Sequence, residues 1–245
     1  MSTIKADTVQ PKDFATDLTL GASGDTVTVA ADSININKVQ DKGGNTLWDY
    51  STGEFVSPKA EFASQNLKLL TTATVSGGTS VSFTTGIDST YDVYIFKFIS
   101  IHPQTNSRAL RFQVSTDSGS TYATNVTSTF FRAYHVNNDS GAGLDYQTAY
   151  DLANSTSYLY LTKELGNLSY NGSSGEMQLF SPSHTTYVKQ FTSRIQAMQD
   201  GDSANQQSLD AFTAGYFNTT SAINAVSFKM TADLFDGTIK MYGLL

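Results

Sequence analysis

From Thr71 to the end of the chain, hydrophobic and polar side chains alternate with a period of two residues. Clusters of Gly, Asn, Asp and Ser interrupt this alternation at short intervals, as is typical of strands joined by tight turns. The predicted strands lie at 72–76, 80–85, 91–101, 108–115, 121–136, 145–152, 156–163, 175–180, 186–199, 207–218, 222–232 and 236–243. So many short antiparallel strands predict an all-β fold, an antiparallel β-sandwich of jelly-roll-like type over residues 71–245.

Residues 1–57 have a different pattern, in which three short alternating pairs are separated by polar turn residues. The pairs are Leu18 and Leu20, Val27 and Val29, and Ile34 and Ile36. Burying these six side chains contributes about 9–18 kcal/mol at best, whereas ordering the chain costs about 1.5 kcal/mol per residue. The segment is therefore predicted to be an extended N-terminal arm of short strands, either flexible or, as we favour, ordered by assembly with identical arms or a larger partner.

Two further features flank the boundary between arm and head. Trp48, the single tryptophan, lies in the strand-like sequence NTLWDY, and we expect it to be buried at a contact surface. The stretch Ala60–Leu70 has Phe62, Ala63 and Leu67 at helical spacing. Residues 58–70 are therefore predicted to form a short helix or a linker.

Charge and composition exclude several classes of function. The chain carries a formal net charge of −7, and its basic residues are scattered singly, so we expect no nucleic-acid partner and no anionic membrane surface. The longest apolar stretch, Val93–Ile101, is interrupted by Lys97 and has about half the length of a membrane span, so no membrane insertion is expected. The N-terminus lacks an apolar leader pattern, so classical secretion is not expected. The absence of cysteine excludes disulfides and thiolate chemistry.

One local motif stands out, the sequence Ser115–Tyr122, which follows the S-x-D-x-G-x-T-aromatic pattern called an Asp-box. In this pattern Asp117 accepts hydrogen bonds from turn amides, Gly119 takes a positive φ, and Tyr122 anchors the hairpin. A sialidase would need several such boxes and clustered arginines, whereas this chain has one box and four scattered arginines. The motif is therefore interpreted as a structural turn.

Metal-binding and catalytic patterns are weak. His102, His135 and His184 lie far apart and form no ligand-type spacing, so we expect surface or rim positions and no metal. The turn at 200–205 offers oxygen atoms at alternate positions and could hold calcium, although a hairpin loop without metal is the favoured interpretation.

Acid pairs are the remaining candidates for catalysis, because sugar hydrolysis needs two carboxyl groups at a suitable separation. Asp145 with Asp151, and Asp200 with Asp202, are the pairs that the sequence offers. Acidic residues in turns are usually solvated turn-formers. We therefore predict no catalytic residue, no cofactor and no enzymatic activity.

Several longer stretches resemble the fibre-type virion structural proteins of tailed bacteriophages, particularly phages of marine bacteria and cyanobacteria, and the resemblance covers nearly the whole chain. The stretches are MSTIKADTVQ, DLTLGASGDTVTVAADSININKV, GGNTLW, TTGIDSTYDVYIFKFISIHP, LRFQVSTDSGSTY, DAFTAGYFNTTSAINAVSFKM and GTIKMYGLL. The resemblance implies a homotrimeric fibre located in the virion, with the arm attached to other virion proteins and the head directed outward. It leaves open whether the arm attaches to the tail or to the capsid of the particle.

The leading hypothesis is accordingly a non-enzymatic tail fibre that recognises the host surface. The alternatives are a capsid-attached head fibre or decoration protein, a polysaccharide-degrading tailspike, and a bacterial surface adhesin. A tailspike usually needs a long repetitive strand ladder with an acidic cleft, and an adhesin needs an export signal. The sequence shows neither feature.

If the head binds a host glycan, exposed loop aromatics and their polar neighbours are the suitable residues, since sugar CH faces stack on aromatic rings and sugar hydroxyls bond Asn and Asp. The candidates are Tyr134, Asn137, Asn138, Asp139 and Tyr170. The simpler interpretation is that these residues only cap strands.

Overall fold

The computed structural model describes residues 38–40, 46–49, 67–199 and 206–244. The chain divides into two compact units, residues 1–63 and 64–245. In the first unit β1 (Lys38–Gln40) pairs antiparallel with β2 (Thr46–Asp49), and Val39 lies opposite Trp48. Trp48 therefore belongs to a strand. The other predicted assembly residues lie outside the described residues, as does the 200–205 turn; they are Leu18, Leu20, Val27, Val29, Ile34 and Ile36.

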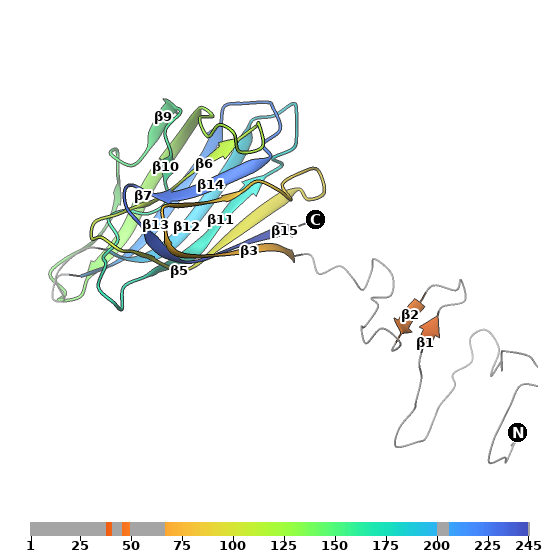
Figure 1. Ribbon diagram of the computed structural model, residues 1–245. Helices are drawn as coiled ribbons and strands as arrows, with labels where there is room; N and C mark the ends of the chain where they lie inside the picture. The colour runs from red at the N-terminus through yellow and green to blue at the C-terminus, as the bar shows by residue number, and fades with distance from the viewer. Residues whose placement is uncertain (1–37, 41–45, 50–66, 200–205, 245) are drawn as a thin grey trace, which may run out of the picture. The chain divides into compact units, whose positions relative to one another are not determined.

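The second unit, which we call the head, is an antiparallel β-sandwich, as the alternation predicts (Figure 1). Its strands are β3 (Leu67–Gly78), β4 (Ser80–Phe83), β5 (Val93–Pro103), β6 (Leu110–Ser115), β7 (Val126–Val136), β8 (Ala142–Tyr146), β9 (Leu152–Ser155), β10 (Leu159–Tyr160), β11 (Ser173–Phe180), β12 (Lys189–Gln199), β13 (Gln207–Phe217), β14 (Ala225–Met230) and β15 (Phe235–Leu244). The described part of the chain contains no α-helix, and hence none that could cross a bilayer.

The two sheets of the head are unequal in width. The large sheet has nine strands in the order β3-β15-β5-β11-β12-β13-β7-β8, with β9 also paired to β7. The small sheet has four strands in the order β10-β6-β14-β4. All neighbouring strands are antiparallel, which is the arrangement expected for hairpin-type turns.

Phenylalanine rings fill the space between the sheets. Phe228 of β14 contacts the rings of Phe96 and Phe98 on β5, each with centroids 5.2 Å apart. Phe112 of β6 meets Phe191 of β12 edge-to-face at 5.1 Å. All five side chains are almost completely buried, so the alternating pattern read from the sequence defines the core.

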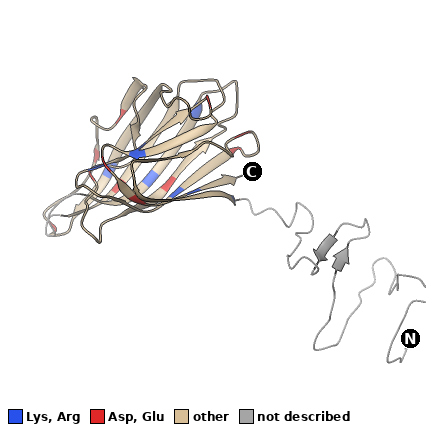
Figure 2. Cartoon of the chain, in the orientation of Figure 1, with Lys and Arg blue, Asp and Glu red and all other residues tan. Residues whose placement is uncertain are grey.

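Charged side chains are sparse on the head, and both signs are interspersed (Figure 2). Lys189 is an exception to their surface placement, since only 1% of it is exposed. Its ammonium donates to the carbonyl oxygens of Tyr187 and Thr219, and burial lowers the pKa of this amine. The buried cation is thus satisfied by backbone carbonyls.

Local spacing misleads in three places, and the first is the predicted strand 156–163, of which only β10 at 159–160 forms a strand. The helical interpretation is wrong for residues 67–70, because β3 begins at Leu67 and its first residues pair with the end of β15, Leu67 opposite Leu244 and Leu69 opposite Tyr242. Strand pairing outweighs the weak local helical preference here. The predicted strand 145–152 is replaced by β8 and β9, which flank a turn at residues 147–151.

The Asp-box forms the structural turn that its sequence predicts. The Ser115 hydroxyl donates to Asp117 Oδ1 at 2.5 Å, and the Thr121 amide donates to the same oxygen at 2.8 Å. The Gly119 amide donates to Ser115 Oγ at 3.0 Å, and its φ is +89°. The hydrogen bond from Ser115, together with those from Thr121, lowers the pKa of the Asp117 carboxyl.

Two glycines allow close strand packing on the inner face of the large sheet. A Cβ atom on Gly175 would lie 2.3 Å from the Arg194 carbonyl oxygen, and one on Gly215 would lie 2.3 Å from the Thr127 carbonyl oxygen. In both cases the neighbouring atom is backbone and cannot move aside without disturbing the ladder.

We therefore predict that Gly175→Ala or Gly215→Ala destabilises the head by about 2 kcal/mol or more, lowering Tm by about 4–8 °C. Thermal unfolding followed by circular dichroism measures this. Gly141→Ala is the matched control, because its Cβ would meet only Val136 Cγ2 at 3.7 Å. Equal melting temperatures for all three variants would show that the strands relax freely.

A second prediction concerns how the stability of the head depends on pH. Because the folded-state pKa of Asp117 is lowered, its contribution to stability is present above the ordinary carboxyl pKa and is lost as pH falls through the folded value. The Asp117→Asn variant should therefore have a lower Tm than the unmodified protein at pH 7. The difference in Tm between the two proteins should become smaller below about pH 4.

Ser120→Ala is the non-titrating control in the same turn, since it removes only the hydroxyl bond to the Asp117 carbonyl at 3.0 Å. Its effect on Tm should be independent of pH. A constant Tm difference for Asp117→Asn between pH 7 and pH 3 would rule out the carboxylate as the source.

Candidate functional site

The head has two opposite ends that differ in what they present. At one end, the chain-entry end, the first residue of β3 pairs with the end of β15, Leu67 opposite Leu244 (Figure 1). At the other end, which we call the distal end, β12 turns toward β13 and β7 toward β8. The described loops of the distal end are 104–109, 137–141, 161–172 and 231–234.

Three of the predicted receptor-binding residues, Asn137, Asn138 and Asp139, form the exposed turn between β7 and β8. The Asp139 carboxylate lies 3.0 Å from His135 Nε2, and the residue has a φ of +59°. Asn138 Oδ1 accepts a hydrogen bond from the Ser140 amide at 2.9 Å. Much of the polar surface of this turn is thus engaged within the turn.

Tyr170 lies in a second distal loop and is 61% exposed. Gln206 connects this loop to the first one, because its carbonyl accepts from the Asn137 amide and its side chain donates to Asn171 Oδ1 at 2.8 Å. His102 Nδ1 donates to the Asn171 carbonyl at 3.0 Å. The structure therefore brings Tyr170 and the 137–139 turn to the same end of the head, as a shared recognition surface requires.

Tyr134 is placed differently from the expectation of an exposed loop aromatic. It lies within β7, half-buried against the core, and the Arg132 guanidinium covers its ring at 4.5 Å from the centroid. The strand runs on to Val136, so the residue faces inward with the other even-numbered positions of β7. Tyr134 thus supports the distal end without presenting a free ring.

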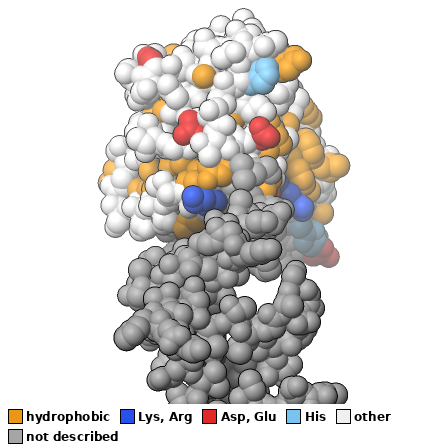
Figure 3. All heavy atoms as spheres, turned by 90° about the vertical axis from the view of Figure 1, so that its right-hand side faces the viewer, with side chains coloured by type: hydrophobic (Ala, Val, Ile, Leu, Met, Phe, Trp, Pro, Cys, Tyr) orange, Lys and Arg blue, Asp and Glu red, His pale blue; other side chains and the backbone are white. Residues whose placement is uncertain are grey.

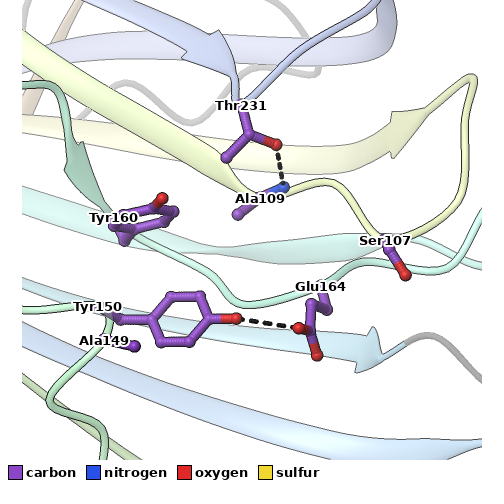
Figure 4. A pocket seen from close by; sticks show the side chains of 7 residues that line it. All are labelled: Ser107, Ala109, Ala149, Tyr150, Tyr160, Glu164 and Thr231. Carbon is purple, nitrogen blue, oxygen red and sulfur yellow. Dashed lines mark hydrogen bonds between the residues drawn. The ribbon is translucent and has the colours of Figure 1, made fainter.

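A pocket of about 310 Å³ opens beside the distal end, and none of its lining residues was among the predicted ones (Figure 4). It is lined by Ser107, Ala109, Ala149, Tyr150, Tyr160, Glu164 and Thr231. Figure 4 shows the Tyr150 hydroxyl pointing at the Glu164 carboxylate, to which it donates at 3.1 Å. Burial, and secondly the Glu164 charge, raises the pKa of the Tyr150 hydroxyl, so it remains a hydrogen-bond donor at neutral pH.

A chain of hydrogen bonds fixes the pocket carboxylate. Glu164 Oε2 accepts from Gln199 Nε2 at 3.0 Å, and Gln199 Oε1 accepts from Arg132 Nη1 at 2.8 Å. Arg132 Nε in turn donates to Asp145 Oδ1 at 3.0 Å. The position of the Glu164 carboxylate is therefore set by side chains from three segments of the fold.

The candidate acids are engaged with other partners in the described residues. Asp145 accepts hydrogen bonds from Arg132 and from Gln147 Nε2, and Asp151 accepts from the Tyr146 hydroxyl at 2.5 Å. Asp200 and Asp202 lie outside the described residues. Within the described ranges no three His, Asp or Glu side chains gather into a group that could hold a metal ion.

His135 and His184 are exposed, as predicted, whereas His102 is half-buried and lies in β5. His184 stacks on Tyr187 with ring centroids 4.8 Å apart. Both residues precede β12 at the chain-entry end of the head. Figure 3 looks onto the end where β15 finishes, and among the side chains in view hydrophobic ones lie in a band across the middle and along the right-hand margin, with a few charged ones among them.

The pocket has the chemistry of a binding site for an uncharged hydroxylated molecule. Glu164 supplies an acceptor, Thr231 and Tyr160 supply hydroxyl groups, and the two tyrosine rings supply apolar walls. Among the lining residues Glu164 is the one carboxylate, and no histidine, lysine or cysteine is present. The sequence gives no local signal for this pocket, because its lining comes from the 107–109, 149–164 and 231 segments.

Comparison with known protein families and with curated proteins finds no match to this chain.

Proposed function

We propose that this protein is a non-enzymatic virion fibre of a tailed bacteriophage, whose arm attaches to the particle and whose head recognises a glycan on the host surface. The observation that carries the proposal is that the chain enters the head at one end, whereas the candidate binding residues lie at the opposite end. The chain enters the head beside Leu67, while the pocket and the exposed 137–139 turn belong to the distal end. In a fibre held by its N-terminus, the distal end is the one that meets the host cell.

The absence of a catalytic arrangement in the pocket supports a binding role over hydrolysis. Glycoside hydrolysis uses two carboxyl groups that face the scissile bond. In this pocket Glu164 is held by Tyr150 and Gln199, and no second carboxylate lines the space. The same donors and acceptors suit the hydroxyl groups of a sugar.

We propose that the fibre attaches to the phage tail, and attachment to the capsid is the alternative. The burial deficit of residues 1–57 supports assembly of the arm in either case, because six apolar side chains from each of three copies can share one core. We propose a homotrimer for this reason.

Replacing Val27 and Val29 together with Asp tests the role of the arm. Like charges inside a shared core would cost several kcal/mol even after partial solvation, so incorporation into particles should fall strongly. Quantitative immunoblotting of purified particles measures this, and circular dichroism should show an unchanged β-sheet head. Normal incorporation of the double variant would show that the arm is a passive tail.

Glu164→Ala tests the role of the pocket. The full-length protein, added in excess, should block adsorption of the phage to its host, and the variant should block about tenfold less well, which corresponds to about 1.4 kcal/mol. Tyr187→Ala is the control, because Tyr187 is 67% exposed and lies at the chain-entry end. Equal blocking by both variants would exclude the pocket, and release of reducing sugar from host polysaccharide would exclude a non-enzymatic role.

A further inference from the structure

The outer face of the large sheet, which points away from the small sheet, carries an unusual share of exposed hydrophobic side chains. Among the described residues nine large hydrophobic side chains are exposed, and six of them lie on this face. The six are Leu69, Ile99, Phe131, Leu144, Tyr146 and Tyr216. Clusters of exposed apolar side chains on one face of a sheet are a common mark of contacts with other macromolecules.

The outer face of the small sheet is different, because the chain covers it with its own loops. Gln113 lies between the inward-facing Phe112 and Val114 and therefore points outward, yet it is fully buried. Its Nε2 atom donates to the carbonyl oxygens of Thr124, Thr156 and Ser157. No comparable covering contact is made to the exposed apolar side chains of the large sheet within the described residues.

Four of these six side chains lie in two patches on opposite sides of the face, whereas Ile99 and Tyr216 lie outside both. The β8 patch consists of Phe131, Leu144, Tyr146 and Phe212. Phe131 pairs with Phe212 on β13 and with Tyr146 on β8. The rings of Phe131 and Phe212 stack with centroids 4.7 Å apart and an interplanar angle of 4°, so this patch is rigid before any partner arrives.

The β3 patch consists of Leu69 of β3 and its pairing partner Tyr242 of β15, and the buried Ile95 of β5 continues the row. Leu69 is 49% exposed and Tyr242 is partly exposed. Leu69 lies two residues after the start of β3.

A belt of charged residues separates the two patches. Lys97 forms an ion pair with Glu176, and Arg194 forms a bidentate pair with Asp210, at 2.7 Å for the shorter bond. These four charges cancel, and Lys240 of β15, opposite Lys97, adds a positive charge to the same face, whereas the whole chain carries −7. This face therefore lacks the acidic excess by which two copies would repel each other elsewhere.

We propose that the outer face of the large sheet is the contact between copies of the head, with the β3 patch of one copy packed on the β8 patch of the next. Two different patches on one face give a head-to-tail contact, which forms a closed ring of three when successive copies are related by a threefold rotation. The inference rests on the homotrimer of the proposed function and specifies the surface that forms it. A sugar fits this face less well than a second copy of the head does. Small ligands bind in concave sites, whereas the apolar side chains of this face lie near both edges of a sheet that is eight strands wide.

Cysteine cross-linking tests the contact, since the chain has no cysteine of its own. The full-length double variant Leu69→Cys, Leu144→Cys is treated at low concentration with a short bismaleimide and separated on a denaturing gel. We expect a covalent trimer from the double variant and essentially none from either single variant. Both positions are about half or more exposed, so the head should fold and melt normally.

The matched control is Leu144→Cys with Tyr187→Cys, which keeps one cysteine on the β8 patch and moves the other to an exposed loop residue outside both patches; it should give no covalent trimer. Light scattering of the unmodified chain separates the possible failures. A trimer that does not cross-link through residues 69 and 144 overturns the assigned surface and leaves the proposed function standing. A monomer overturns both, and covalent dimers from Leu144→Cys alone would show a symmetric contact in place of the head-to-tail one.

Discussion

The architecture depends on the packing of a four-stranded sheet on a nine-stranded one through a cluster of phenylalanine rings. Phe228 of the small sheet lies at the centre of this cluster and contacts Phe83, Phe96, Phe98 and Phe112, with centroids between 5.2 and 6.1 Å apart. The small sheet is too narrow to cover the whole inner face of the large one. The turn between β8 and β9 contributes to covering the remainder, since the Tyr150 ring packs on Phe130 of β7 with centroids 5.4 Å apart.

This mismatch in width explains where the pocket lies. A segment with little regular structure covers the inner face less evenly than a strand would, and the pocket between Tyr150, Tyr160 and Glu164 forms there. The Glu164 side chain is 43% exposed, and its carboxylate is held by hydrogen bonds from Gln199 and Tyr150 and by the Lys163 ammonium 3.9 Å away. The outer face of the large sheet, in contrast, has no covering segment within the described residues, and its apolar patches remain available to a partner.

Sequence patterns predict those features that depend on neighbouring residues. The period of two locates most strands, and the Asp-box predicts its own hydrogen bonds because Ser115, Asp117 and Thr121 act within one turn. The helical interpretation of residues 58–70 is wrong for its last four residues because their pairing partner, β15, lies at the far end of the sequence. The pocket and the exposure of Tyr134 depend on segments that meet only in the fold, so no local pattern could reveal them.

Direct imaging of the particle tests the central claim, that the head is carried on the virion with its distal end outward. An antibody fragment raised against the 137–141 turn, which is largely exposed, can be located on purified virions by electron microscopy. The account predicts labels at the free tips of fibres, at the greatest distance from the tail or capsid. Labels against the particle body, or particles without any label, would contradict it.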